Sequence, residues 1–193
     1  MGYTPKILAF AGSTRRDSFN KKLVKVAAAG ATAAGAQVTI VDLKDYPMPL
    51  YDGDLEAEQG IPENAKKLKT LMVSHDGFLI SSPEYNSSIS GVLKNTIDWI
   101  SRPVPNEEPL IAFNGKVVSL MSASPGALGG LRGLVTVRSL LSNINVIVLP
   151  GQVAVPKAHE AFEADGKLKD AKQQASVEAL GRDLTNTLAK LKS

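Results

Sequence analysis

The stretch that decides the fold is KILAFAGSTRRDSFN, residues 6–20, in which an apolar run leads into a polar loop. Residues 6–11 have the continuous apolar pattern of a strand that is buried on both faces, and this run ends at Gly12. A helix pattern begins at Phe19 and continues through alanine-rich sequence to Ala34, where Gly35 ends it. A buried strand followed directly by a helix is a βα unit, so the stretch indicates a parallel sheet covered by helices.

The same alternation continues through the rest of the chain. Further strands are predicted at residues 37–42, 77–82, 116–121 and 145–149, and further helices at 62–74, 91–101 and 128–142. A last helix carries an apolar stripe at a spacing of three and four, formed by Val177, Leu180, Leu184, Leu188 and Leu191. We therefore predict one α/β domain over residues 1–193, with five mostly parallel strands and helices on both faces of the sheet.

Composition narrows the classes of function. The 193 residues include no cysteine and only two histidines, His75 and His159, which argues against disulfides, thiol chemistry and a histidine metal centre. The net charge of +3 is too small to indicate a nucleic-acid partner. No apolar run approaches the roughly 20 residues of a membrane-spanning helix, and no secretory signal pattern is present, so we expect a cytoplasmic protein without membrane or nucleic-acid partners.

The loop after the first strand, residues 12–20, has the composition of a phosphate site. It combines three hydroxyl side chains with Arg15 and Arg16 and leads into a helix N-terminus, whose free N–H groups favour anions. A plain helix cap formed by Ser18 is the alternative. A dinucleotide fingerprint is excluded because Gly12 is the only glycine between Gly2 and Gly30, and the lysine of a triphosphate loop is missing. The loop thus suits one terminal phosphate.

Two further loops, residues 82–91 and 122–130, follow the third and fourth strands. The first combines proline and small polar residues with Tyr85, and the second has three glycines in five residues, Gly126, Gly129 and Gly130. The first could instead be an exposed turn whose Ser90 caps the next helix. The glycines of the second could instead serve tight turning and close packing of a helix on the sheet. Because ligands bind outside the carboxyl ends of parallel strands, all three loops are expected at one edge of the sheet.

Taken together, GSTRRDSFN, SPEYNSSISGVLKNTIDWISR and SASPGALGGLRG resemble motifs of the NADPH-dependent FMN reductase family, which includes bacterial quinone, chromate and azo-dye reductases. The resemblance covers nearly the whole chain. It implies a flavodoxin-like fold with strand order 2-1-3-4-5 and a bound FMN. Two positions depart from the family pattern: Ser90 stands where the family often has proline, and Ser122 where it often has glycine.

The resemblance also implies which residues bind the cofactor, and it assigns none of them a catalytic or metal-binding role. The phosphate would be held by Ser13, Arg15, Ser18 and Asn20, with Phe19 beside them, and the ring would be lined by Pro83, Glu84, Tyr85, Asn86, Ser124 and Gly126.

The activity implied by the resemblance is oxidation of NADPH or NADH, with electrons passed through FMN to a quinone, chromate, an azo compound or free flavin. Donor and acceptor would use one site in turn, which gives ping-pong kinetics. The protein would be a homodimer or homotetramer, with the Leu50–Asp54 loop and the helix end at Trp99–Arg102 as candidate contact regions. Two alternatives remain: a flavodoxin-type electron carrier, although such carriers are usually acidic, and an FMN-binding module without turnover.

Overall fold

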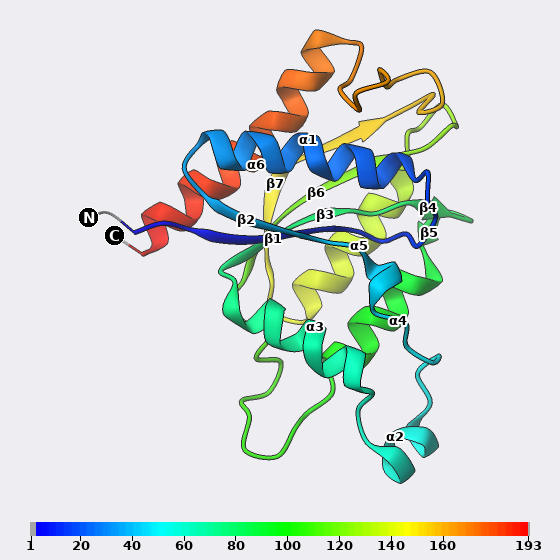
Figure 1. Cartoon of the computed structure of the whole chain (residues 1–193), viewed down its shortest axis with the longest axis vertical. Helices are drawn as coiled ribbons and strands as arrows, with labels where there is room; N and C mark the ends of the chain where they lie inside the picture. The colour runs from blue at the N-terminus through cyan, green and yellow to red at the C-terminus, as the bar shows by residue number, and fades with distance from the viewer. Residues whose placement is uncertain (1–2, 193) are drawn as a thin grey trace.

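In the computed structural model, which describes residues 3–192, a five-stranded sheet forms the middle layer (Figure 1). Its order is β2-β1-β3-β6-β7, and every neighbouring pair is parallel. The strands are β1 (Lys6–Ala11), β2 (Gln37–Val41), β3 (Gly77–Ser81), β6 (Val117–Ala123) and β7 (Ile147–Val155). This confirms the predicted flavodoxin-like fold, and β6 and β7 take the places of the fourth and fifth strands.

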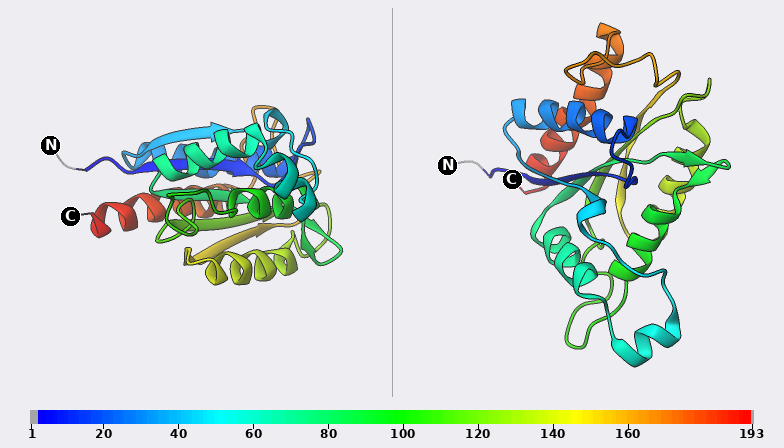
Figure 2. Two further views of the ribbon diagram at one scale, coloured as in Figure 1. Left: turned by 90° about the horizontal axis from the view of Figure 1, so that it is seen from below. Right: turned by 45° about the vertical axis from the view of Figure 1, so that its right-hand side comes forward.

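Helices cover both faces of the sheet, as the two views in Figure 2 show. One face packs against α1 (Phe19–Ala33) and α6 (Ala171–Leu191), and the other against α3 (Glu63–Ser74), α4 (Gly91–Ile100) and α5 (Leu131–Asn143). Strand β1 shows why the strands read as continuously apolar: Ile7 and Ala9 belong to the first core, whereas Leu8 and Phe10 belong to the second.

Helices α1 and α6 pack with their backbones in contact. A Cβ atom added to Gly30 of α1 would lie 2.1 Å from the carbonyl oxygen of Glu178, and one added to Gly181 of α6 would lie 2.0 Å from that of Ala27. Only glycine leaves room for this approach. The helix that follows the first loop is therefore fixed in position by the last helix of the chain.

The differences from the predicted elements lie mostly at turns. Helix α5 begins at Leu131 and not at Leu128, because Gly129 and Gly130 have φ angles of 62° and 93°, which are incompatible with a right-handed helix. Strand β7 extends to Val155 past a register shift opposite Val118 and Leu120. Short elements without a strong periodic signal were not predicted; they are the helix α2 (Gly53–Gln59), the 3-10 turn η1 (Leu43–Asp45) and the hairpin strands β4 (Glu84–Tyr85) and β5 (Ser88–Ile89).

Among residues 3–192, no helix combines the length and the apolar character that crossing a membrane requires.

Candidate functional site

The three polar loops meet at the carboxyl edge of the sheet, on the right in Figure 1. A hollow of about 200 Å³ lies between them. Its lining consists of Ser13, Arg15, Ser18, Phe19, Asn20, Pro83, Glu84, Tyr85, Ala123, Ser124 and Pro125. The structure thus brings together all the predicted cofactor residues except Asn86 and Gly126, which lie outside the lining. Ala123 and Pro125 were not predicted, since neither side chain has a polar group to single it out.

The first loop presents a helix N-terminus whose donors are not capped by a side chain. Ser18 is the N-cap residue of α1 and is buried, but its hydroxyl makes no capping hydrogen bond within the described chain. The first turn of α1 carries no acidic residue, and the exposed Arg15 has no carboxylate partner among residues 3–192. Free N–H groups at a helix N-terminus beside an unpaired guanidinium have the chemistry that suits an anion. The helix cap that was the alternative interpretation is not formed.

Asn20 ties the first loop to the sheet. Its Nδ2 donates to the Ala123 carbonyl oxygen (2.9 Å), and its Oδ1 accepts from the Ala123 N–H (3.0 Å) and from the Ser81 hydroxyl (2.8 Å). The side chain is buried. It therefore links α1 to β3 and β6 below the hollow, and the predicted contact of Asn20 with a phosphate stays a prediction.

The second loop is a hairpin of β4 and β5. Its two turn residues, Asn86 and Ser87, have φ angles of 51° and 65°, as in the tight turns that match strand twist. Tyr85 is 53% exposed and supplies a flat apolar surface beside the hollow.

Glu84 fastens this hairpin to α5. Arg132 Nε donates to Glu84 Oε1 (2.9 Å), and the N–H of Gly133 donates to Oε2 (3.0 Å). Burial would raise the pKa of this carboxyl, but the hydrogen bonds from Gly133 and Arg132 together hold its pKa below the usual value. Both carboxylate oxygens of Glu84 are thus hydrogen-bonded to the start of α5. This structural role could not be predicted from the sequence, because Arg132 is 48 residues away from Glu84.

We expect Glu84→Gln to destabilise the protein at pH 7 by about 1 kcal/mol, because a neutral amide makes weaker bonds to Arg132 and Gly133. The pKa of Glu84 is lower in the folded protein than in the unfolded chain, where it is about 4.3. Its contribution to the free energy of unfolding is therefore complete above the unfolded pKa and is lost as the pH falls through the folded pKa. Urea unfolding from pH 7 to pH 3 should therefore show the difference between parent and variant narrowing in acid. Glu58→Gln, at an exposed position of α2, is the control. An equal difference at every pH would contradict this account.

Ser90 joins the first loop to α4. Its hydroxyl donates to the Gly12 carbonyl oxygen (2.6 Å) and accepts from the N–H of Leu93 (3.2 Å). Proline at this position would remove both hydrogen bonds, so this departure from the family pattern adds a link between two of the three loops.

The third loop is shaped by Ser122 and Gly130. The Ser122 hydroxyl is buried without a hydrogen-bond partner among the described residues, and a Cβ atom on Gly130 would lie 1.9 Å from it. Gly130 also has a positive φ. Serine at position 122 thus requires glycine at position 130. Beyond it, the Ser124 N–H donates to Val155 O (3.1 Å) and fixes the loop to the end of β7.

Known proteins are similar to this chain over most of its length. Residues 5–160 match the model of a family described as NADPH-dependent FMN reductase. An NAD(P)H-dependent FMN reductase of Pseudomonas aeruginosa is 34% identical over 174 residues, which cover 90% of this chain and 89% of that protein. A quinone reductase of Escherichia coli is 36% identical over 148 residues, which cover 75% of this chain and 73% of that protein.

Among solved structures, the flavoenzyme NAD(P)H:(acceptor) oxidoreductase FerB of Paracoccus denitrificans superimposes with a TM-score of 0.81 at 28% identity. The match covers 97% of this chain and 98% of that one.

Proposed function

Because the chain belongs to the NADPH-dependent FMN reductase family, we propose that it binds FMN at the carboxyl edge of its sheet and passes electrons from NAD(P)H to small acceptors. Quinones, chromate, azo compounds and free flavin are the proposed acceptors. The proposed kinetic scheme is ping-pong, with the nicotinamide leaving before the acceptor enters.

The observation that carries this proposal is the anion site of the first loop. FMN ends in a single phosphate monoester, and the loop offers the uncapped N–H groups of α1, the hydroxyls of Ser13 and Ser18, and the unpaired guanidinium of Arg15. FMN has no pyrophosphate, so it does not need the glycine-rich loop with which proteins bind a dinucleotide. The residues present therefore fit this cofactor.

Bound FMN supplies the redox chemistry, and the protein supplies binding, orientation and exclusion of water. Arg15 and the start of α1 hold the phosphate and so set the position of the whole cofactor. The hairpin, fastened to α5 through Glu84, holds Tyr85 and Pro83 at the side of the hollow. The carboxylate of Glu84, which also lines the hollow, is bonded to Arg132 and Gly133 and so serves to position the hairpin.

We also propose that the protein is a homodimer or homotetramer, supported by the exposed loop around Leu50. Leu50 is 80% exposed, and its loop is held in place because Trp99 Nε1 donates to Pro49 O (2.8 Å) and the Tyr51 N–H donates to Asn95 Oδ1 (2.8 Å). Trp99 itself is fully buried, so Leu50 is the side chain available for contact. Light scattering of the parent and of Leu50→Asp tests this; a fully active monomer would refute it.

The purified protein should be yellow and should release FMN on denaturation, because its loop suits one phosphate. It should oxidise NAD(P)H faster when a soluble quinone is added. Chromatography of the released flavin and the absorbance of NAD(P)H at steady state measure the two results. Release of mainly FAD would contradict the cofactor assignment. Bound FMN without NAD(P)H turnover would instead support the electron carrier or the binding module.

A further inference from the structure

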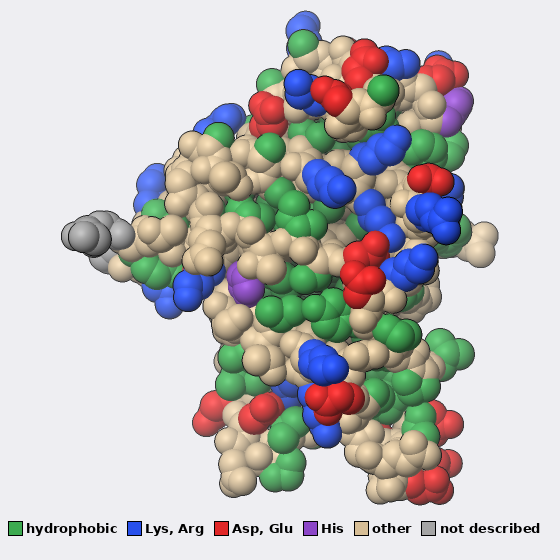
Figure 3. Space-filling view, viewed as in Figure 1, with side chains coloured by type: hydrophobic (Ala, Val, Ile, Leu, Met, Phe, Trp, Pro, Cys, Tyr) green, Lys and Arg blue, Asp and Glu red, His purple; other side chains and the backbone are tan. Residues whose placement is uncertain are grey.

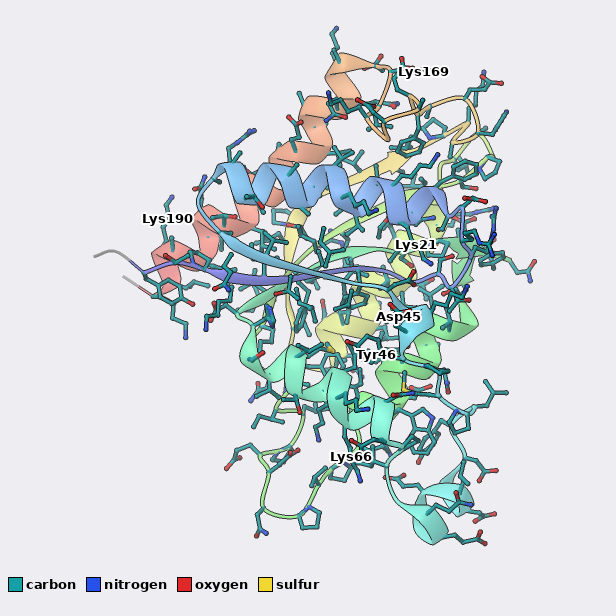
Figure 4. All side chains as sticks on the ribbon, in the orientation of Figure 1. Lys21, Asp45, Tyr46, Lys66, Lys169 and Lys190 are labelled. Atoms are coloured by element: carbon teal, nitrogen blue, oxygen red, sulfur yellow. The ribbon has the colours of Figure 1, made fainter. Side chains whose placement is uncertain are left out.

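A long segment between β7 and α6, residues 156–169, contacts two of the three polar loops but contributes no residue to the lining of the hollow between them. Figure 1 shows this segment in orange above the first turns of α1, and Figure 4 places Lys169, its last residue, above Lys21 of α1. The proposed function gives the segment no role. Any effect that it has on the cofactor must therefore pass through the loops that it contacts.

The start of the segment is bonded to the backbone of the third loop. The N–H of Ala158 donates to Ser124 O (3.1 Å), and the N–H of Ser124 donates to the carbonyl oxygen of Val155 at the end of β7 (3.1 Å). Ala158 is buried, and a Cβ atom on Gly129 would lie 2.7 Å from the nitrogen of Pro156. The third loop and the start of the segment are therefore packed as one unit.

The middle of the segment contacts the start of α1 through Phe162. The rings of Phe162 and Phe19 are nearly parallel, with an interplanar angle of 5° and centroids 6.3 Å apart. Lys22, one turn along α1, places its Nζ 5.8 Å from the Phe162 centroid, on the part of α1 where Figure 3 shows Lys and Arg side chains gathered. Parallel offset rings attract each other, and a ring face attracts a cation. Because Phe19 lines the hollow, Phe162 lies directly behind its wall.

Phe162 is itself held in place by bonds that do not involve the first loop. It pairs with Leu168 in an antiparallel bridge across a tight turn, in which the N–H of Glu163 donates to Lys167 O (2.8 Å). Leu168 is buried, and its N–H donates to Gln174 Oε1 of α6 (2.9 Å). The ring of Phe162 thus has a position set by α6 and the turn, against which Phe19 packs.

We propose that Phe162 is a positioning residue for the phosphate of FMN, because its ring holds Phe19 and the first turn of α1 at a fixed place relative to the third loop. The inference rests on the proposed function, since it concerns the binding of FMN. Phe19 directly follows the N-cap residue Ser18, so a shift of Phe19 moves the N–H groups and the hydroxyl offered to the phosphate. Loss of the Phe162 ring loosens this end of the site, whereas the hairpin stays fastened to α5 through Glu84.

Fluorescence titration of the apoprotein with FMN and with riboflavin tests this role. Phe162→Ala should bind FMN about tenfold more weakly, as expected for the loss of an aromatic pair and a cation–ring contact, and should bind riboflavin like the parent. Phe162→Leu keeps an apolar side chain without the ring and should resemble Phe162→Ala, so the test does not depend on the fold of one variant. Phe162→Tyr keeps the ring and should restore FMN binding.

Leu188→Ala is the matched control for a general loss of stability. Leu188 is a buried residue of α6 that lies beside Gly77, at the amino end of β3 and away from the loops. Its removal should lower the free energy of unfolding and leave the affinity for FMN unchanged. A tenfold loss of FMN affinity in this control as well would show that the effect of Phe162 reports stability alone and would overturn the inference.

The double variant F19L/F162A tests whether Phe162 acts through Phe19. In the Phe19→Leu background, adding Phe162→Ala should cost less than about twofold in FMN affinity, because residues that act through one contact are not additive. The same tenfold loss in both backgrounds, equal losses for FMN and riboflavin, or a Phe162→Tyr variant as weak as Phe162→Ala would overturn the positioning role. A Phe162→Ala variant that binds FMN like the parent would refute this role and leave the proposed function standing. A parent protein that binds neither flavin would refute the proposed function and the inference with it.

Discussion

Arg15→Ala is expected to weaken FMN binding about ten- to a hundredfold and to leave riboflavin binding nearly unchanged. Arg15 lines the hollow and has no carboxylate partner among residues 3–192, so its guanidinium is available to a phosphate with close to two negative charges. Charge-assisted hydrogen bonds are worth roughly 1.5–3 kcal/mol, and each 1.4 kcal/mol corresponds to about tenfold in affinity. Riboflavin has no phosphate and gives Arg15 nothing to bind.

Fluorescence titration of the apoprotein with each flavin measures this effect. Arg16→Ala is the control, since Arg16 lines a separate hollow between α1 and β2, and this variant should bind FMN like the parent. Equal losses for FMN and riboflavin would show that Arg15 supports the fold of the loop and not the phosphate. If Arg15→Ala bound FMN as tightly as the parent, Arg15 would not be a ligand of the phosphate.

Asn20→Ala is expected to lower the free energy of unfolding of the apoprotein by about 3 kcal/mol. The substitution removes three buried hydrogen bonds and leaves the N–H and carbonyl of Ala123 and the hydroxyl of Ser81 without partners. Each unsatisfied buried group costs about 1–3 kcal/mol, and relaxation recovers part of the sum.

Urea denaturation without flavin measures this loss free of any effect on cofactor binding. Asn143→Ala provides the matched control: Asn143 is exposed near the end of α5, and its removal should change stability by less than about 0.5 kcal/mol. If Asn20→Ala were as stable as the parent but bound FMN poorly, the side chain would be a ligand to the cofactor and not a brace between α1 and the sheet.

The sheet could be predicted from the sequence because parallel strands buried on both faces leave continuous apolar runs, as in residues 6–11. The meeting of the three loops followed from the rule that ligands bind at the carboxyl ends of such strands. The bonds that hold the loops in place could not be predicted in this way. Asn20 and Ala123 are 103 residues apart, Ser90 and Gly12 are 78 apart, and a single sequence gives no signal of such pairs.

The positions of the two arginines in the first loop also could not be predicted from the sequence. Arg15 and Arg16 are neighbours with the same chemistry, so composition predicts an anion site without separating them. The turn at residues 16–17 places Arg15 in the lining of one hollow and Arg16 in that of the other.

The close packing of α1 against α6 at Gly30 and Gly181 sets an order on the folding of the newly made chain. Helix α1 is synthesised before α6, so the face of α1 that meets α6 stays uncovered until residues 171–191 have been synthesised. Domains fold as cooperative units, so the scaffold beneath the phosphate loop is completed only after α6 has been made. A chain truncated before residues 171–191 is therefore left with an open apolar face on α1.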